Sequence, residues 1–508
     1  MSWRSPKLPD RREGHHALAG GERMVSGWGW KWCAWLLGLG LVACGVAPSE
    51  PGDVPAPQET PDTLDTGGTC PSATRLADFS TGGPFGLATE LTGVKGTLYF
   101  VVDDGIHGPA LWASDGTLGG TRLFRDFDAT PRNLTEARGL LFFIVDRTLW
   151  RTDGTDAGTL PLVTAAAPPS FFTPIGITGE FRNRLFFHMY TPEVGLELWV
   201  SDGTPGGTRL YLDINPGPPS SGGGEIVETA SGNLVLDVRL GAAADTLAVL
   251  ELSPTGAIEE LYSTPGNEEA AIFRLTAVGD RVFFLVDLAD GAPSLFTSDG
   301  TPGAATLLYS WDGVGTPRDF TAYEGRLYFV AEEDDSADYA GLELWVSDGT
   351  PAGTGRLVDI RPGEDASWPR GLTVFEGLLY FSADDGEHGR ELWVSDGTAE
   401  GTELARDIRP GPEGSSPYGL TVASRKLYFA ADDGEHGIEP WKVFHGRARL
   451  VEDVVPGPVG SAPQVYRLGF FDEDPVFARA GSYLFFSSES LEFWSMRTGA
   501  YCPPSGTR

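Results

Sequence analysis

The sequence has little positive charge, few cysteines and almost no long hydrophobic run. Its 508 residues include 37 Lys+Arg against 71 Asp+Glu, and only four Cys. Nucleic acids and anionic lipid surfaces would be repelled by so acidic a chain, so neither is expected as a partner. The one continuous apolar run, at 35–42, is too short to span a bilayer, and we expect the remainder to form a soluble body.

The start of the chain has the features of an export signal. Lys31 supplies positive charge, the apolar run follows, and Met24 is a better natural start than Met1. The run ends in Leu-Val-Ala-Cys at 41–44, which resembles the lipobox of bacterial lipoproteins. This resemblance implies cleavage before Cys44 and lipidation of its thiol. An ordinary secretory signal followed by a chance Cys is the alternative.

These features predict a signal peptide at 1–43 and a protein anchored outside the cytoplasm, in the outer membrane or periplasm. Residues 44–69 are rich in Pro, Asp, Glu, Thr and Gly without apolar periodicity, which predicts a disordered tether behind the lipidated Cys44. The segment before Cys44 holds six Lys+Arg and three Asp+Glu, which leaves 31 against 68, a net charge of −37. The lipid is therefore the expected membrane contact.

Two cysteines remain once Cys33 leaves with the signal and Cys44 takes the lipid. They are Cys70 and Cys502, which bracket most of the chain. In an oxidising compartment we predict that they form a disulfide, with two unrelated thiols as the alternative.

One phrase recurs along the chain. It reads Glu-Leu-Trp-Val-Ser-Asp-Gly-Thr at 391–398, followed by Gly-Thr at 401–402. Close copies lie at 197–208 and 343–354, looser copies at 110–121, 148–159 and 294–306, and degenerate copies at 250–256, 439–446 and 492–499. The anchor positions are Trp112, Trp150, Trp199, Leu252, Phe296, Trp345, Trp393, Trp441 and Trp494, about 48 residues apart. A fixed period of this length is typical of a repeat architecture.

Each repeat contains four short strands. In the repeat around Trp393 they are 371–375, 378–383, 391–395 and 402–408, and the Asp-Gly at 396–397 predicts a turn. The apolar run at 378–381 suits a sheet that is covered on both faces, as in a propeller blade. The anchor tryptophans are then wedges between blades with an N–H that needs one partner; stacking on a cofactor is the alternative.

The fold class predicted is all-β, a single large β-propeller at 70–502, followed by a tail at 503–508. Its nine blades are expected at 85–127, 133–163, 172–214, 225–262, 272–309, 320–360, 371–408, 419–454 and 465–500. The ninth lacks a fourth strand, and 74–79 matches 355–360, so an N-terminal strand is predicted to close the ring. Eight blades is the alternative count, and we expect a monomer.

The repeated Glu-Leu-Trp-x-x-Asp-Gly-Thr resembles the ELWxxDGT repeat family of bacterial, notably myxobacterial, secreted and lipid-anchored proteins. The resemblance covers roughly 75–502 and implies a propeller-like repeat protein at the cell envelope. It brings no established activity, so no catalytic residue is carried over.

Two sets of loops are expected on one face of the propeller. The loop at 384–389, between the second and third strands, recurs at 103–108 and 432–437, and the crossovers between blades lie at 213–217, 359–363, 407–411 and 453–457. The candidate binding residues on this face are Asp103, Asp104, His107, Asp384, Asp385, Glu387, His388, Arg409, Asp432, Asp433, Glu435 and His436. The predicted partner is a protein or polysaccharide of the envelope or exterior.

Metal binding at these loops is the weaker interpretation. Oxygens of Asp384 and Asp385 would suit Ca²⁺, but neighbouring strand residues point to opposite faces and EF-hand spacing is absent, which favours turn chemistry. His388, with its equivalents, could ligate a transition metal, but one His per blade is more typical of a packed loop residue. No cofactor is therefore predicted, with Ca²⁺ as the alternative.

Catalytic signatures are missing as well. The chain has no Gly-x-Ser-x-Gly, no His-Glu-x-x-His, no Gly-Lys-Ser/Thr and no Cys-x-x-Cys. We predict a binding scaffold without enzymatic activity. The alternative is a propeller enzyme that acts on glycans, or a quinoprotein-like oxidoreductase.

Overall fold

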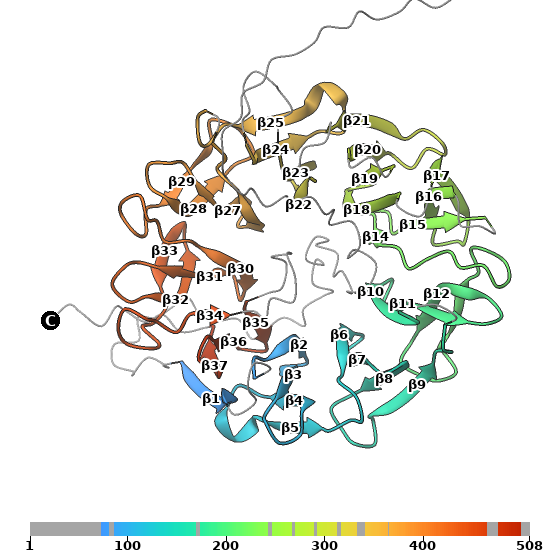
Figure 1. Cartoon of the computed structure of the whole chain (residues 1–508), viewed down its shortest axis with the longest axis horizontal. Helices are drawn as coiled ribbons and strands as arrows, with labels where there is room; N and C mark the ends of the chain where they lie inside the picture. The colour runs from blue at the N-terminus through green and yellow to red at the C-terminus, as the bar shows by residue number, and fades with distance from the viewer. Residues whose placement is uncertain are drawn as a thin grey trace, which may run out of the picture. The chain divides into compact units, whose positions relative to one another are not determined.

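The computed structural model describes residues 73–80, 86–168, 173–241, 246–266, 270–288, 292–311, 316–332, 341–363, 365–464 and 476–498. The chain divides into two units, 1–37 and 38–508, and all described residues belong to the second. That second unit is built from nine antiparallel sheets arranged as the blades of a β-propeller (Figure 1). None of the described residues lies in a helix that is long and apolar enough to cross a membrane.

Eight blades are sheets of four consecutive strands. The first three blades comprise β2 (Thr89–Val94), β3 (Thr97–Asp103), β4 (Pro109–Ser114) and β5 (Arg122–Arg125); β6 (Arg132–Ala137), β7 (Leu140–Val145), β8 (Thr148–Thr152) and β9 (Leu160–Thr164); and β10 (Ile175–Phe181), β11 (Arg184–Thr191), β12 (Gly195–Ser201) and β13 (Arg209–Leu212).

Blades four to six follow in the same order. They comprise β14 (Ile226–Glu228), β15 (Leu234–Leu240), β16 (Thr246–Leu252) and β17 (Ile258–Pro265); β18 (Ala271–Val278), β19 (Arg281–Asp287), β20 (Ser294–Ser298) and β21 (Thr306–Ser310); and β22 (Arg318–Tyr323), β23 (Arg326–Ala331), β24 (Glu343–Ser347) and β25 (Thr354–Val358).

Blades seven and eight complete the series of four-stranded sheets. They comprise β26 (Arg370–Phe375), β27 (Leu378–Asp384), β28 (Arg390–Ser395) and β29 (Thr402–Arg406); and β30 (Tyr418–Ala423), β31 (Lys426–Asp432), β32 (Ile438–Phe444) and β33 (Arg447–Leu450). Two short 3₁₀ turns, η2 (Leu118–Gly120) in blade one and η3 (Pro351–Gly353) in blade six, lie between the third and fourth strands of their blades.

The ninth blade joins the two ends of the chain. Its strands are β34 (Pro463–Gln464), β35 (Ala478–Ala480), β36 (Tyr483–Ser488), β37 (Glu492–Arg497) and, at the outer edge, β1 (Thr74–Asp78). β1 pairs antiparallel with β37, with Thr74 opposite Ser495 and Asp78 opposite Glu492. The prediction of nine blades closed by an N-terminal strand is therefore confirmed, and the count of eight is wrong.

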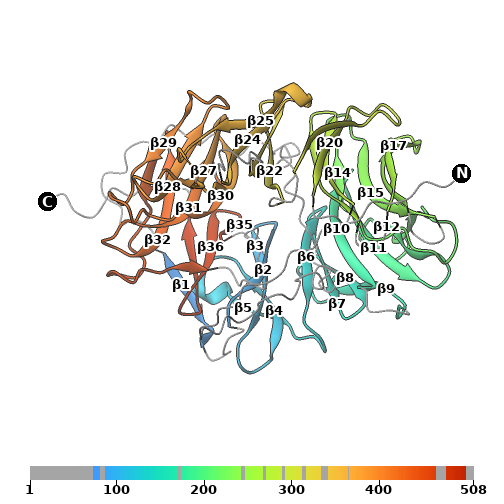
Figure 2. The same ribbon diagram turned by 45° about the horizontal axis from the view of Figure 1, so that its top comes forward.

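Each blade runs from the centre of the ring to its rim. The first strand faces the central opening and the fourth lies outside, an arrangement visible in both views (Figures 1 and 2). First strands of neighbouring blades contact one another, as β2 does β6 and β26 does β30. Successive blades therefore touch along their inner edges as well as through their faces.

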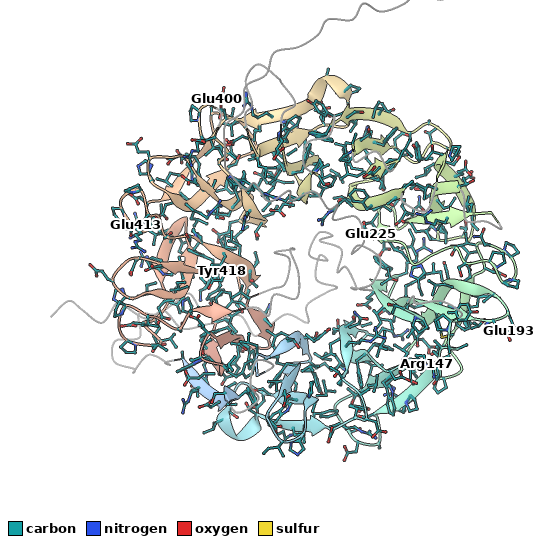
Figure 3. The ribbon with its side chains drawn as sticks, in the orientation of Figure 1. Arg147, Glu193, Glu225, Glu400, Glu413 and Tyr418 are labelled. Atoms are coloured by element: carbon teal, nitrogen blue, oxygen red, sulfur yellow. The ribbon has the colours of Figure 1, made fainter. Side chains whose placement is uncertain are left out.

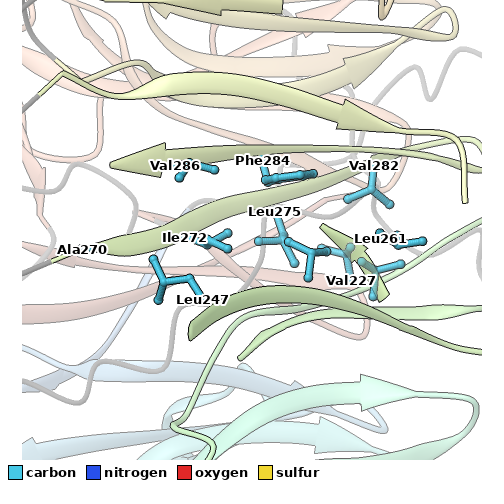
Figure 4. Packing of buried hydrophobic residues seen from close by; sticks show 11 residues of the cluster. Val227, Leu247, Leu261, Ala270, Ile272, Leu275, Val282, Phe284 and Val286 are labelled. Carbon is cyan, nitrogen blue, oxygen red and sulfur yellow. The ribbon is translucent and has the colours of Figure 1, made fainter. Parts of the chain in front are cut away.

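Nine apolar clusters fill the nine interfaces between blades. The cluster between blades four and five contains Leu247 and Leu261 from one blade and Ile272 and Phe284 from the next (Figure 4). The cluster between blades nine and one joins Phe485 and Phe493 to Phe100. Because both faces of a blade are covered, its second strand is buried without alternation, as residues 379–383 of β27 are.

Candidate functional site: the loop face

The repeated motif folds into a turn that bonds mainly to itself. In blade seven, Asp396 Oδ1 accepts hydrogen bonds from the amide and the hydroxyl of Thr398, at 2.9 and 2.6 Å. The Thr398 hydroxyl oxygen accepts from the amide of Gly401 at 2.9 Å, and the Ser395 and Thr402 hydroxyls are 2.8 Å apart. The side-chain hydrogen bond to Thr398 lowers the pKa of Asp396. These motif residues are therefore committed to the turn between the third and fourth strands.

The tryptophan of each motif lies in the interface with the preceding blade. Trp393 belongs to the cluster between blades six and seven, and Trp441 to the cluster between blades seven and eight. The other seven anchors also pack in the interface with the preceding blade. They are Trp112, Trp150, Trp199, Leu252, Phe296, Trp345 and Trp494.

The indole N–H groups differ from the sequence expectation. Six of them are buried and have no hydrogen-bond partner within the described part of the chain: those of Trp112, Trp199, Trp345, Trp393, Trp441 and Trp494. Each such donor costs stability on the order of 1–3 kcal/mol, which the packing of the large ring must offset.

The motif glutamate, which sequence reasoning left without a role, holds the crossover to the next blade. Glu391 Oε1 accepts hydrogen bonds from the amides of Arg409 and Ser415, both at 2.9 Å. Glu391 Oε2 accepts from the Ser415 hydroxyl at 2.5 Å. Glutamate–serine pairs of the same kind are Glu197 with Ser221, Glu343 with Ser367, and Glu439 with Ser461.

These glutamates are fully buried, and burial raises the pKa of each. The effect is largest at Glu197, where burial raises the pKa to about 7 although hydrogen bonds from Ile214 and Ser221 lower it. The neighbouring Asp213 raises the pKa of Glu197 further. The motif therefore fixes the path of the crossover at the cost of burying a carboxyl group.

The loop between the second and third strands has its own internal bonds. In blade seven, Asp384 Oδ1 accepts from the amide of Gly386 at 2.7 Å. Asp385 Oδ1 accepts from the amides of Glu387 and His388, and its Oδ2 lies 2.7 Å from His388 Nδ1. Burial raises the pKa of Asp385, but the bonds from His388 outweigh it and lower the pKa; the same side-chain bond raises the pKa of His388.

Blade eight repeats this arrangement, and blade one carries most of it. Asp432 accepts from Gly434 at 2.7 Å, and Asp433 Oδ2 lies 2.7 Å from His436 Nδ1. In blade one the corresponding carboxylates of Asp103 and Asp104 bond to Gly105 and His107, with 2.8 Å between Asp104 Oδ2 and His107 Nδ1.

In two of the four crossovers, 359–363 and 407–411, an arginine bonds to the loop of the following blade. Arg409 donates to Asp432 Oδ2 at 2.6 Å and also pairs with Glu413, which lies near the rim (Figure 3). Arg361 donates in the same way to Asp384, at 3.2 Å. These bonds place the crossovers and the 2–3 loops side by side. We call this surface the loop face: residues 103–108, 384–389, 432–437 and the crossovers 213–217, 359–363, 407–411 and 453–457.

The tips of the three loops are exposed. Glu387 and Glu435 are exposed, and Ile106 takes the corresponding position in blade one, where 81% of its surface is exposed. The structure thus brings the predicted Asp and His residues together in the loops of blades one, seven and eight, and Arg409 bonds to the loop of blade eight from the preceding crossover. Each loop has an internally bonded base and an exposed tip whose residue differs between blade one and the other two.

The described residues contain no group of three or more His, Cys, Asp or Glu placed to hold a metal ion. The aspartates considered for Ca²⁺ bond instead to loop amides and to His or Arg. Cys44, Cys70 and Cys502 lie outside the described residues, as do the signal peptide and the tether.

The fold and these contacts define the protein as a nine-bladed β-propeller with a repeated, internally bonded loop face. The sequence matches no protein-family model and no curated protein. Solved structures that align with it include the computationally designed Ika8 protein, with 17% identity, a TM-score of 0.41, and coverage of 73% of this chain and 99% of that one.

Two peptidase structures align over part of their length. One, from a study of two prolyl endopeptidases, has 12% identity, a TM-score of 0.39, and coverage of 72% of this chain and 58% of that one. A puromycin-hydrolysing peptidase of Mycobacterium tuberculosis has 13% identity, a TM-score of 0.35, and coverage of 71% and 61%. Similarity at this level carries no argument about activity, and the propeller assignment rests on the strand pairing.

Proposed function

We propose that the protein is a lipid-anchored, extracytoplasmic scaffold whose loop face binds a protein or polysaccharide of the envelope or exterior. The observation that carries this proposal is the recurrence of one internally bonded loop in blades one, seven and eight. In each, an Asp pair fixes the loop backbone and leaves the tip residue in solvent.

A fixed loop favours binding because the cost of ordering it is met on folding and not on association. The bonds of Asp385 to two amides and to His388 hold the loop of blade seven before any ligand arrives. Loops that are positioned by a rigid scaffold commonly carry binding residues. The loop face has both properties.

The arrangement also repeats along the ring. Blades seven and eight are neighbours, so Glu387 and Glu435 are presented by equivalent loops one blade apart, and Arg409 connects the two blades. A ligand that extends over several blades, such as a folded protein surface or a polysaccharide chain, would contact more than one tip.

The anchor part of the proposal rests on Cys44 and its sequence context. The full chain is expected to partition into the detergent phase, and Cys44→Ser should abolish that partitioning. Unchanged partitioning of the variant would contradict the anchor without bearing on the loop face.

A binding screen tests the scaffold. The Cys44→Ser chain would be presented to a glycan panel and to envelope extract, with and without Ca²⁺. We expect saturable binding without turnover. Conversion of a bound glycan would show that the protein is an enzyme and would contradict the scaffold function. Absence of saturable binding to either source would also contradict the proposal.

A further inference from the structure

Blade eight departs from the repeat at the end opposite to the loop face. Its third and fourth strands are joined by only His445 and Gly446, with φ values of 49° and 67°, as a two-residue hairpin requires. In blade seven the same connection runs from Ser395 to Thr402 and contains the motif turn. The motif turn is therefore absent from the hairpin that joins the end of β32 to the start of β33.

The residue three positions after the anchor is negative in six blades, but not in blades four, eight and nine. Three residues after the anchor, an Asp is found in six blades: Asp115, Asp153, Asp202, Asp299, Asp348 and Asp396. Blade eight has Phe444 there, and blade nine has Arg497, whose guanidinium lies 5.5 Å from the Tyr483 ring. We call the outer end of β32 and β33, together with Arg497, the positive seam. It belongs to a chain whose net charge is −34.

A cavity of about 380 Å³ opens at this seam. The described residues that line it are Phe444, His445, Arg447 and Arg449. Lys442 is the direct cross-strand partner of Arg449 and lies two residues before Phe444, so its side chain is on the same face of the sheet. Only 7% of Lys442 is exposed.

Lys442 is a buried cation without a bonded counter-charge among the described residues. Lys426 lies nearby, but it is also positive and donates to the Thr498 carbonyl at 2.5 Å. Burial, followed by repulsion from Lys426 and Arg449, lowers the pKa of Lys442 to about 8. Burying an uncompensated charge is costly, and a bound anion would relieve that cost.

We propose that this cavity is an anion site that binds a phosphate or sulfate group of a soluble ligand. Guanidinium groups such as those of Arg447 and Arg449 suit the oxygens of such groups, and Lys442 adds a desolvated charge beneath them. The acidity of the whole chain does not prevent this, because charges are screened beyond about 8 Å at physiological ionic strength. The site is separate from the loop face, since the loop at 432–437 precedes β32 and the cavity lies at its far end.

Inorganic phosphate is the probe that tests the site. The melting temperature of the full chain would be followed against phosphate concentration, with sodium chloride at matched ionic strength as reference. Phosphate also stabilises proteins non-specifically, so the decisive quantity is the response of the wild type minus that of Lys442→Met. Arg449→Gln is a second variant that keeps the buried lysine, and Arg209→Gln, on the fourth strand of blade three, is the matched control.

We expect saturable binding of phosphate that weakens at least about tenfold in Lys442→Met and in Arg449→Gln but not in Arg209→Gln. An equal response of all four proteins would overturn the site. Cosedimentation of the Cys44→Ser chain with phosphatidylglycerol vesicles, lost in Arg449→Gln while phosphate gives no specific response, would overturn the soluble ligand in favour of a lipid headgroup.

Discussion

Thr74 and Ser495 are direct cross-strand partners although they come from opposite ends of the chain. Their pairing supplies the ninth blade with its outer strand, and Leu76 on that strand is buried in the cluster between blades nine and one. The ring is therefore closed by hydrogen bonds between the chain ends.

Leu76→Ala tests this closure. The substitution removes buried side-chain atoms from the interface, and we expect a loss of about 2–5 kcal/mol in the free energy of unfolding, measured by chemical denaturation. Leu357→Ala, at the corresponding position of blade six, is the matched control and should lose a comparable or smaller amount because Leu357 is only partly buried. If Leu76→Ala were neutral while Leu357→Ala destabilised, β1 would not be part of the ring.

The predicted disulfide between Cys70 and Cys502 follows from the same pairing. Because β1 and β37 are antiparallel, the start of β1 lies beside the end of β37. The segment before β1 and the segment after β37 therefore begin at the same end of the ninth blade. Non-reducing peptide mapping should recover one fragment that joins the two cysteines, and Cys502→Ser should lower the melting temperature. In the chain-entropy model, closing a loop of about 430 residues gives about 6 kcal/mol as an upper bound, and the contribution of a disulfide seldom exceeds about 5 kcal/mol. Free thiols at both positions in exported protein would refute the bond.

Two adjacent glycines in blade three should respond differently to the same substitution. A Cβ on Gly207 would overlap the Asp202 carboxylate that organises the motif turn, whereas a Cβ on Gly206 would meet nothing within 4 Å. We expect Gly207→Ala to lower the free energy of unfolding by about 1–3 kcal/mol and Gly206→Ala to change it by less than about 0.5. Thermal and urea denaturation would measure both, and equal effects would show that the turn does not need its glycine.

Glu197 should make the fold less stable as the pH rises. Its folded-state pKa of about 7 lies above the unfolded value of about 4.3, so the unfolded chain loses the proton first. The stability that the protonated group contributes is fully present below pH 4, and roughly 4 kcal/mol of it is lost as the pH rises through 7.

Glu197→Gln should flatten this part of the pH profile whatever it does to absolute stability. The exposed Glu403→Gln is the control and should leave the slope unchanged. Urea denaturation from pH 4 to pH 8 would measure the slope, and a wild-type slope in Glu197→Gln would contradict the raised pKa.

The sequence allowed the architecture to be predicted because each repeat carries its own turn chemistry. Leu252 could be recognised as the anchor of a degenerate copy by its spacing alone. The closing strand at 74–79 could be matched to 355–360 of blade six by its residues. The role of Glu391 could not be predicted in the same way, because its partner Ser415 belongs to the next crossover. One signal was available: the serine follows the glutamate by 24 residues in three repeats and by 22 in the fourth.

The loop face could be predicted as a surface but not in its contacts. Up-and-down connectivity placed both loop sets on one side, whereas the bond from Arg361 to Asp384 depends on the packing of two blades. The positive seam at Lys442 was hidden by the overall negative charge, because only the pairing with Arg449 shows that the cations gather.

Reversal of charge at the loop tips is the most direct test of the proposed binding face. Cosedimentation with isolated envelope would be measured in the Cys44→Ser chain, which lacks the proposed anchor. The three proteins compared are this chain with no further change, with Glu387→Lys combined with Glu435→Lys, and with Glu400→Lys. Glu400 lies in the motif turn at the opposite end of the strands and near the rim, and provides the matched control (Figure 3). Since the loops are held by Asp385 and Asp433, all three proteins should melt alike. We predict at least a tenfold loss of binding in the double variant alone, and equal binding by all three would contradict the proposed face.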